Sequence, residues 1–350
     1  MKYWLLIGFL VPVIAFSQGN QVQYTNLALE GGGVRGLAYA GALSVLEEKG
    51  VLSHVQRVAG SSAGAIAGLM VCLGYDSHEI DSVLQNLKIQ EFNDGKDIFG
   101  KIRRIRREYG VYKGDKIEAW LGQLIEKKTG NPDLTFLGLH ELCQKDPRFK
   151  DLYCTGTNIS QQELEVFSWV NWPEMKLRTA VHISSCIPFY FKPVPIDELG
   201  NEVPLSDSLD KYNLYVDGGM LCNYPINMFD SCTDGGSPLT SDHVIYNPHT
   251  LGLKLERDQQ IKELEENKTD IAAYHIANMK QYTAAVMNLV MENINRRTPD
   301  LSNEKGRTIY ISYGDISSRV RKISAAERKM LFDNGVSATE KFLDKPTARL

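Results

Sequence analysis

The chain has 350 residues, 43% of them hydrophobic and 23% charged, with 43 acidic against 39 basic side chains. This composition is too apolar for a disordered protein, and the apolar stretches are too interrupted for a multi-span membrane protein. The length fits one large domain or one domain with an appendage, and the net charge of −4 gives no reason to expect nucleic-acid binding.

Residues 1–17 have the features of a secretory signal peptide. Lys2 supplies the positive end, residues 5–16 form an apolar run, and Ala15-Phe16-Ser17 has the small-residue spacing of a signal peptidase site. The run is shorter than the ~20 residues that a membrane-spanning helix needs. Pro12 also interrupts it, so cleavage is favoured over an uncleaved anchor. We therefore expect export, with the periplasm, the outer membrane or the medium as the final location.

The chain divides near residue 255 into two parts that differ in their pattern of apolar and charged residues. In residues 18–255, short apolar runs alternate with helical patterns, which is typical of an α/β domain whose parallel strands are buried on both faces. Residues 256–350 are predicted to form a mainly helical extension. It comprises a long charged helix or helix pair at 258–297, a short strand at 308–312 and a last helix opened by a capping box at 324–327. This extension could cover a substrate groove, form a partner surface or complete the core.

A glycine-rich turn follows the first predicted strand, at residues 26–30. The turn reads Gly31-Gly32-Gly33-Val34-Arg35-Gly36 and leads into a helix predicted at 37–48. Glycines let backbone amides approach a ligand closely, although a merely tight connection is the alternative. The spacing also satisfies GxGxxG, but the next strand ends Val58-Ala59-Gly60-Ser61-Ser62, without the acidic residue that would hold a ribose. No Lys-Ser or Lys-Thr pair follows the glycines, which argues against a P-loop.

A second turn carries a candidate nucleophile. A strand at 55–59 runs into Gly60-Ser61-Ser62-Ala63-Gly64, and a small-residue helix follows at 65–73. Strand, GxSxG and helix in this order hold a serine in a strained turn with its hydroxyl above the sheet. Side chains larger than Gly60 and Gly64 would be expected to collide there, and the helix dipole favours negative charge near Ser62. The motif predicts Ser62 as a nucleophile, with a helix-capping serine as the alternative.

A serine nucleophile needs a base, and the residues at 214–219 offer a carboxylate. They read Leu-Tyr-Val-Asp-Gly-Gly, so that Asp217 ends an apolar strand and Gly218 and Gly219 allow another group close to it. An ordinary Asp-Gly turn is the alternative. The seven histidines offer no clear candidate, although the chain order would allow a triad of Ser62, Asp217 and either His243 or His249.

These three motifs in this order resemble the patatin-like phospholipase family, and the resemblance runs from about residue 26 to 253. It includes Tyr109-Gly110-Val111-Tyr112, Thr155-Gly156-Thr157-Asn158, Ser184-Ser185-Cys186-Ile187-Pro188-Phe189 and Tyr224-Pro225-Ile226. The resemblance implies a three-layer α/β/α fold with a mostly parallel central sheet, and an acyl hydrolase domain at 18–255. Two departures from the family pattern are mild. Glu30 stands where the family commonly has Asp, and Gly219 stands where Ala is frequent.

The resemblance also implies a Ser-Asp dyad without histidine, in which Ser62 attacks an acyl ester and Asp217 accepts its proton. The residues that match the family's oxyanion loop are Gly31, Gly32, Gly33 and Arg35, and the remaining motif glycines are Gly36, Gly60, Gly64, Gly218 and Gly219. One oxyanion amide donor is typically worth ~2.7 to 4 kcal/mol. Arg35 could add charge stabilisation or lie on the helix surface.

Asp217 would be a weak base at an ordinary carboxylate pKa of about 3.9. We therefore expect Tyr215, Val216 and Met220 to desolvate it partly, which would raise that pKa. The six cysteines, Cys72, Cys143, Cys154, Cys186, Cys222 and Cys232, form no CxxC pair. Neither a zinc site nor a disulfide scaffold is indicated, although export would permit one or two disulfides. We expect no cofactor and no calcium requirement.

Two segments suggest how the protein could bind a lipid. The apolar run at 187–193 would suit the lip of an acyl groove or could be core. The run at 101–107 contains Lys101, Arg103, Arg104, Arg106 and Arg107, interleaved with Ile102 and Ile105. Such a helix could contact anionic headgroups, at about 1 kcal/mol per basic residue, or could be a solvated surface helix.

The sequence therefore predicts an exported lipid acyl hydrolase of the phospholipase A or lysophospholipase type, with a lipid substrate and peripheral membrane contact. A general esterase with a Ser-Asp-His triad and a non-catalytic lipid-binding module are the alternatives. The sequence leaves the headgroup, the acyl position, the chain length and the oligomeric state open.

Overall fold

The computed structural model describes residues 22–345, apart from 96–97, 206–210, 242, 269–271, 275, 280, 283–284, 287–288 and 290–300. The expected signal peptide at 1–17 lies outside the described residues.

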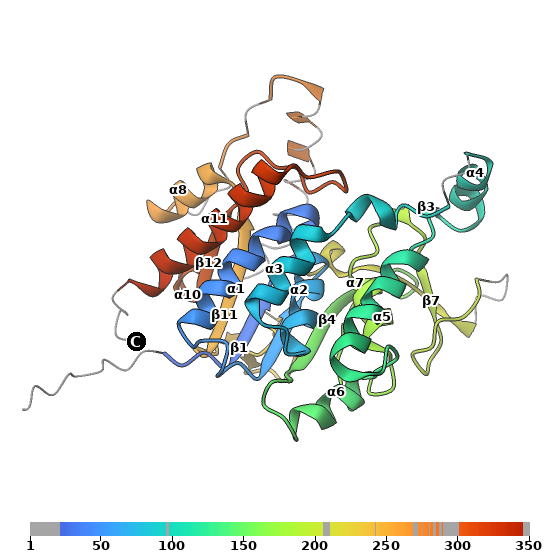
Figure 1. The fold of residues 1–350 in the computed structure, drawn as a ribbon, viewed down its shortest axis with the longest axis horizontal. Helices are drawn as coiled ribbons and strands as arrows, with labels where there is room; N and C mark the ends of the chain where they lie inside the picture. Colours follow the sequence, from blue (N-terminus) through green and yellow to red (C-terminus); the bar gives the residue numbers. More distant parts are fainter. Residues whose placement is uncertain are drawn as a thin grey trace, which may run out of the picture.

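An eight-stranded sheet forms the centre of the molecule (Figure 1). Its order is β12-β11-β1-β2-β4-β8-β7, with β5 paired to β4. The pairs from β12 to β4 are parallel, whereas β4-β5, β4-β8 and β7-β8 are antiparallel. The strands are β1 (Asn26–Leu29), β2 (Arg57–Gly60), β4 (Asp151–Asn158), β5 (Glu163–Phe167), β7 (Val194–Ile196), β8 (Asn213–Asp217), β11 (Thr250–Glu256) and β12 (Thr308–Ser312). The predicted mostly parallel sheet is confirmed.

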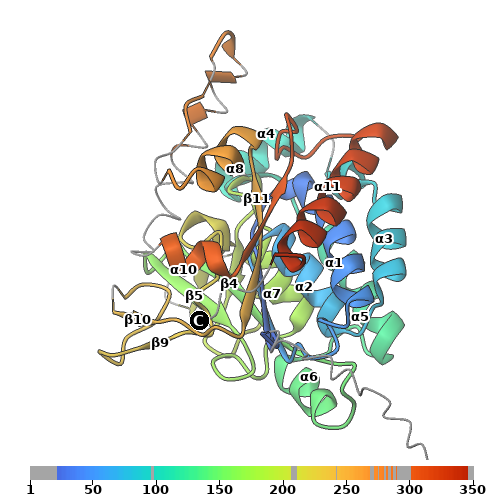
Figure 2. The same ribbon diagram turned by 90° about the vertical axis from the view of Figure 1, so that its left-hand side faces the viewer.

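Helices cover both faces of this sheet, as the α/β/α prediction requires. Figure 2 shows α1, α2, α3 and α11 on one side of β11, with α8, α10 and the small β9-β10 sheet on the other. The helices are α1 (Tyr39–Glu48), α2 (Ala63–Cys72), α3 (Ser77–Asn86), α4 (Ile98–Arg107), α5 (Asp115–Thr129), α6 (Phe136–Cys143), α7 (Leu177–Ser184), α8 (Asp258–Glu265), α10 (Leu301–Gly306) and α11 (Ala325–Leu343). The short strands are β3 (Gly110–Tyr112), β6 (Phe189–Phe191), β9 (Ser231–Cys232) and β10 (Val244–Ile245).

The central strands are short and apolar because both of their faces are covered. All residues of β1 and β11 are buried, as are the last three of β2. In the parallel register, Leu29 lies opposite both Gly60 and Leu253. The ends of β1 and β2 therefore lie side by side, and the two glycine-containing turns that follow them meet at one edge of the sheet.

The C-terminal part of the chain completes the core, which is one of the three roles that the sequence left open. The predicted strand at 308–312 is β12, which pairs with β11. Helix α11 packs directly against α1 through two glycines. A Cβ on Gly41 would lie 2.0 Å from the carbonyl oxygen of Phe332, and one on Gly335 would lie 2.2 Å from that of Ala38. The two backbones can approach this closely only because neither glycine has a side chain.

Two polar contacts secure the same part of the chain. The predicted capping box is present, since the Ser324 hydroxyl accepts from the amide of Glu327 at 3.2 Å and the Ser324 amide donates to the Glu327 carboxylate at 2.8 Å. The buried Arg307 guanidinium donates two hydrogen bonds to Asp230, at 2.7 and 2.6 Å. This paired geometry compensates the two charges for the loss of water, and it connects the start of β12 to the loop that follows Asp217.

The sequence predicts a long charged helix or a helix pair at 258–297, and of these two the single continuous helix is wrong. Helix α8 ends at Glu265, and Asn267 takes a φ of +61°. Asparagine tolerates this left-handed conformation better than most residues, and it commonly ends helices. Much of the rest of the predicted stretch lies outside the described residues.

Within the described part of the chain, no helix is long and apolar enough to cross a membrane. All six cysteines are described and all are free thiols. The structure therefore contains none of the disulfides that export would permit between them. No group of three or more His, Cys, Asp or Glu side chains among the described residues could hold a metal ion.

Candidate active site

Three segments that are distant in sequence meet at one edge of the sheet. Gly31 follows β1, Ser62 follows β2, and Asp217 is the last residue of β8. The first two arrive on parallel strands, whose C-terminal ends commonly carry sites in α/β folds. Asp217 arrives from the opposite direction, because β8 runs antiparallel to β4 and places Asp217 beside Gly156. The adjacency of Ser62 and Asp217 therefore depends on this reversal of strand direction.

Ser62 has a strained backbone, with φ of +52° and ψ of −121°. Such a conformation is rare for a residue with a side chain and is a feature of nucleophile turns. The Ser62 amide donates to the Ser184 hydroxyl at 3.0 Å, and α2 begins at the next residue. The Ser62 side chain makes no capping hydrogen bond. Its hydroxyl instead donates to Asp217 Oδ2 at 2.8 Å, so the helix-cap alternative does not describe this side chain.

The two glycines of GxSxG are required by the close packing of the turn. A Cβ on Gly64 would lie 2.3 Å from the carbonyl oxygen of Leu29, and one on Gly60 would lie 2.5 Å from the backbone of Gly64. Both contacts are with backbone, which cannot move aside. The expected steric role of Gly60 and Gly64 thus agrees with the geometry. The other motif glycines, Gly36, Gly218 and Gly219, would place a Cβ 2.8 Å or less from a neighbouring atom.

Replacing Gly64 with alanine should lower both the melting temperature and ester turnover. The added Cβ must push strand β1 away from α2, and overpacking of this kind typically costs about 1–3 kcal/mol. Gly122→Ala in α5 is the matched control, because its Cβ would meet nothing nearer than 3.5 Å and alanine favours a helix interior. Thermal unfolding and a soluble-ester assay measure the two effects. A Gly64→Ala protein with wild-type stability and turnover would contradict this reading of the turn.

Asp217 is buried, and both of its carboxylate oxygens have partners. Oδ2 accepts from the Ser62 hydroxyl, and Oδ1 accepts from the Gly219 amide at 2.8 Å. Burial raises the pKa of Asp217 to about 7, although the hydrogen bonds from Gly219 and Ser62 oppose the shift. Tyr215 and Val216 are buried as expected, but Met220 is 42% exposed, because it lies at the end of the turn that leaves the sheet.

The glycine-rich turn contributes fewer amide donors than its sequence suggests. The Gly31 amide is already bonded to the Asn223 carbonyl oxygen at 2.9 Å, so Gly31 is wrong as an oxyanion donor. The absence of a side chain at Gly31 still matters, because a Cβ there would lie 3.1 Å from Ser62 Cβ. No hydrogen bond runs from the amides of Gly32 or Gly33 to another described residue. Gly32 caps and Gly33 begins a 3₁₀ helix at Gly33–Ala38, and the first amides of such a helix have no partner within it.

Arg35 anchors the glycine-rich turn to the C-terminal part of the chain. Its Nε donates to the Ile316 carbonyl oxygen at 2.7 Å, and its guanidinium lies 3.6 Å from the centre of the Tyr313 ring. It therefore does not simply lie on the helix surface. Gly33 is close to the same segment, since a Cβ on it would lie 2.1 Å from the Ser318 carbonyl oxygen. The segment at 313–318 thus helps to fix the turn.

Asn223 is a site residue that the sequence did not reveal. Its side-chain amide donates to the Gly31 carbonyl oxygen at 3.0 Å and to the Glu30 carboxylate at 3.3 Å. The other Glu30 oxygen accepts from the Leu255 amide at 2.8 Å. Asn223 therefore joins the glycine-rich turn to the loop that follows Asp217. The available signal was an asparagine six residues after Asp217, directly before Tyr224-Pro225, but asparagine is common in loops.

Neither triad candidate lies at the Ser62-Asp217 pair. His249 precedes β11, and its Nδ1 lies 2.8 Å from the Gln23 carbonyl oxygen, at the start of β1 and thus at the opposite edge of the sheet. His243 is exposed and directly precedes β10. Among the described residues, no imidazole is hydrogen-bonded to Ser62 or Asp217.

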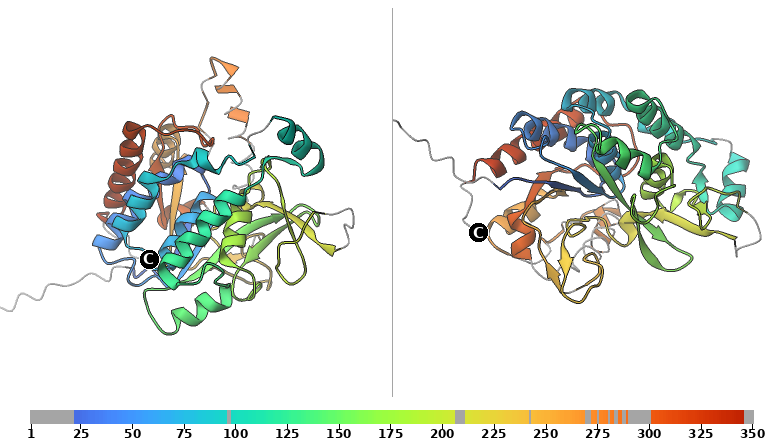
Figure 3. Two further views of the ribbon diagram at one scale, coloured as in Figure 1. Left: turned by 45° about the vertical axis from the view of Figure 1, so that its right-hand side comes forward. Right: turned by 90° about the horizontal axis from the view of Figure 1, so that it is seen from below.

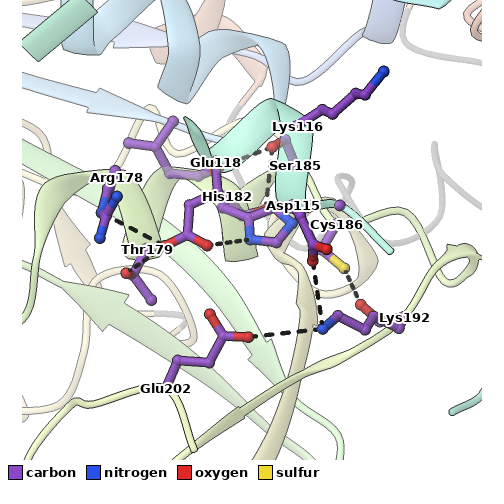
Figure 4. A network of polar contacts seen from close by, with 12 residues as sticks. Asp115, Lys116, Glu118, Arg178, Thr179, His182, Ser185, Cys186, Lys192 and Glu202 are labelled. Atoms are coloured by element: carbon purple, nitrogen blue, oxygen red, sulfur yellow. Dashed lines mark hydrogen bonds and ion pairs between the residues drawn. The ribbon is translucent and has the colours of Figure 1, made fainter. Parts of the chain in front are cut away.

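His182 is buried in a charged network behind the site (Figure 4). Its Nδ1 lies 3.9 Å from a Glu118 carboxylate oxygen, and Lys192 lies 3.7 Å from Asp115 and 4.0 Å from Glu202. Burial lowers the pKa of His182, which favours the neutral imidazole. His182 is on α7, two residues before Ser184, so this network supports the helix that holds the Ser62 amide.

The apolar run at 187–193 is partly core and partly surface. Phe191 and Pro193 are buried, whereas Phe189 is 81% exposed. Tyr190 is half-buried, and its hydroxyl donates to the Asn93 side chain at 2.6 Å. Only part of the run therefore faces solvent.

Comparison with known proteins identifies relatives over most of the chain. Residues 27–230 match the sequence model of a family described as patatin-like phospholipase. The chain is 26% identical over 329 residues to the uncharacterized protein R571 of Acanthamoeba polyphaga mimivirus, which covers 93% of this chain and 96% of that protein. It is 26% identical over 206 residues to the probable lipid hydrolase 463L of Invertebrate iridescent virus 6, covering 59% of this chain and 63% of that protein. The crystal structure of VipD from Legionella pneumophila has the same fold, with a TM-score of 0.56 at 16% identity, over 92% of this chain and 67% of that one.

Proposed function

The chain belongs to the patatin-like phospholipase family, and from this membership we propose that it is a serine acyl hydrolase that cleaves lipid esters with Ser62 and Asp217. The observation that carries the proposal is the 2.8 Å hydrogen bond from the strained Ser62 hydroxyl to the buried Asp217 carboxylate. The pKa of Asp217, raised to about 7, lets this carboxylate act as a base near neutral pH.

In the proposed first step, Asp217 Oδ2 takes the Ser62 hydroxyl proton while Ser62 Oγ attacks the ester carbonyl carbon. The amides of Gly32 and Gly33 donate to the oxyanion that forms. The N-terminus of α2, directly after Ser62, favours the same negative charge.

Collapse of the tetrahedral intermediate breaks the ester bond, and the proton on Asp217 passes to the leaving alcohol. The acyl group then remains on Ser62. In the second step Asp217 takes a proton from water, whose oxygen attacks the acyl-enzyme and releases the fatty acid. The same carboxylate thus serves as base in both attacks and as acid in both departures.

Phospholipids and lysophospholipids are the proposed substrates, because the family membership supports a lipid ester. Residues 18–255 carry the proposed dyad, whereas residues 256–350 supply β12, α11 and the contacts that hold the glycine-rich turn. Residues 1–17 are proposed to direct the chain out of the cytoplasm.

Labelling with a fluorophosphonate, run beside a panel of phospholipids and lysophospholipids, tests this function. The wild-type chain should react and should release fatty acid, and the adduct should map to the peptide that carries Ser62. Ser61→Ala is the matched control, because the neighbouring hydroxyl is bonded to Thr155 and to the Cys222 carbonyl oxygen and takes no part in the chemistry. An adduct elsewhere would refute the assignment. A protein that bound lipid but showed neither labelling nor hydrolysis would be a lipid-binding module.

A further inference from the structure

Helix α4 lies outside the three layers and is joined to the rest of the molecule through β3 (Figures 1 and 3). Two of its five basic side chains point inward. Arg104 is buried, donates to the Val111 carbonyl oxygen at 3.0 Å and also contacts the Gly95 carbonyl oxygen, while Lys101 lies over the Tyr112 ring. These two residues anchor the helix, so only three of its five basic side chains are left to contact headgroups. Arg103, Arg106 and Arg107 remain exposed.

An exposed apolar stripe runs beside these three arginines. Ile102 and Ile105, three residues apart on one face of α4, are 49% and 51% exposed, and Tyr109, just beyond the end of α4, is 51% exposed. Phe189 extends the stripe, because β3 pairs with β6 and places Gly110 opposite Phe189. Phe189 is 81% exposed and has a φ of +64°, an unfavourable conformation for an aromatic residue, so the fold holds this ring in solvent against a local backbone cost.

We propose that this face, formed by Ile102, Ile105, Tyr109, Phe189, Arg103, Arg106 and Arg107, binds the surface of an anionic lipid bilayer. The inference rests on the proposed function. It adds which face of the protein contacts the lipid surface and which side chains make that contact. A helix with an apolar stripe beside clustered arginines lies in the interface of a membrane, with its apolar side chains among the acyl chains and its cations at the headgroups. Contiguous exposed apolar side chains on a soluble domain mark an interaction surface, and the adjacent positive charge selects an anionic one.

A cavity of about 420 Å³ between α4 and the body supports the same partner. Its charged lining consists of Arg103, Arg104, Lys113, Lys192, Glu108 and Asp115, four cations against two carboxylates. An excess of positive charge in a hollow directly behind the arginines suits the phosphate of a lipid headgroup.

The bilayer-binding face is joined directly to the dyad. The Asp217 amide donates to the Cys186 carbonyl oxygen at 2.9 Å, and Phe189 follows Cys186 by three residues, a span of at most about 11 Å. Docking therefore brings the lipid surface to the side of the molecule at which Asp217 lies.

Vesicle flotation with the full chain carrying Ser62→Ala tests the inference without hydrolysis of the lipid. Vesicles of phosphatidylcholine alone are compared with vesicles that also contain phosphatidylserine. The Ser62→Ala protein should bind the anionic vesicles, and added salt should weaken that binding. Adding R103E, R106E and R107E should weaken it by about 100-fold, given about 1 kcal/mol per basic residue. Adding I102S, I105S and F189S should weaken it by about tenfold or more.

The matched charge control is K49E, K145E and R148E, which makes the same change in net charge. These residues are exposed in the connections that lead into β2 and β4, at the opposite edge of the sheet from Ser62. The control should bind like the Ser62→Ala parent. Absence of binding to anionic vesicles, or equal weakening in the control and the arginine variant, would overturn the inference. Since no Ser62 hydroxyl is present, these outcomes are separate from success or failure of the proposed function.

Discussion

Replacing Ser62 with alanine should lower hydrolysis of a lipid ester by about 10⁴-fold or more, and should abolish fluorophosphonate labelling. The expected size follows from serine hydrolases in which loss of the nucleophile leaves only the modest rate enhancement of binding and oxyanion stabilisation. The reason is specific to this geometry. Alanine removes the only hydroxyl that donates to Asp217 Oδ2 among the described residues, and no second hydroxyl at the site shares its contact. Steady-state kinetics on a soluble ester, with active protein concentration fixed, measures the loss.

The fold should survive this substitution, because the hydrogen bond from the Ser62 amide to Ser184 involves backbone and is retained. The free energy of unfolding should fall by no more than about 1–3 kcal/mol, the cost of leaving the buried Asp217 Oδ2 without its partner. A Ser62→Ala protein that folds normally and still hydrolyses ester at more than a small fraction of the wild-type rate would exclude Ser62 as the nucleophile.

Replacing Asp217 with asparagine should lower kcat/KM by about 10³- to 10⁴-fold without unfolding the protein. An asparagine side chain can still accept the Gly219 hydrogen bond, but it cannot take up the Ser62 proton, so the loss is one of general-base catalysis. Asp333→Asn on the exposed surface of α11 is the control and should leave kinetics unchanged. Similar activity for Asp217→Asn and the control would rule out Asp217 as the base.

The activity of the wild-type protein should rise with pH through an apparent pKa near 7 and then level off. The burial of Asp217 raises its pKa to about 7 from an ordinary value of 3.8, and only the ionised carboxylate can accept the serine proton. A pH profile of kcat/KM on an ester whose own chemistry is flat between pH 5 and 9 measures this, and a plateau that extends below pH 5 would contradict it.

Stability should show the opposite trend with pH. Because the folded-state pKa lies above the unfolded one, the protonated form of Asp217 is favoured in the folded protein. This contribution to the free energy of unfolding is fully present below about pH 4 and is lost as the pH rises through about 7. The melting temperature of Asp217→Asn relative to wild type should therefore increase across this range.

The turn at Ser62, the strand that ends at Asp217 and the glycine-rich turn were predicted from the sequence, and the family resemblance implied that Ser62 and Asp217 meet. Each of these three segments depends on local chemistry. A serine in a strained turn needs small residues on both sides, as Gly60 and Gly64 provide, and a carboxylate followed by two glycines can sit against other backbone. Strand β12 and the capping box of α11 were also predicted correctly, because a short β-branched run and a Ser-x-x-Glu pattern determine them locally.

What only the tertiary structure decided are the contacts between these local units. The sequence could not show that the Gly31 amide donates to Asn223, that Arg35 is held by Tyr313 and Ile316, or that Arg104 of α4 is buried. Nor could it show that Met220 is exposed although its neighbours in β8 are buried. The environment of one amide, one guanidinium group or one thioether leaves no repeating pattern in the sequence. It depends on residues that lie far away along the chain. Contacts between distant segments therefore determine which hydrogen-bond donors remain available for chemistry. The spacing of residues along the chain identifies only the candidate residues.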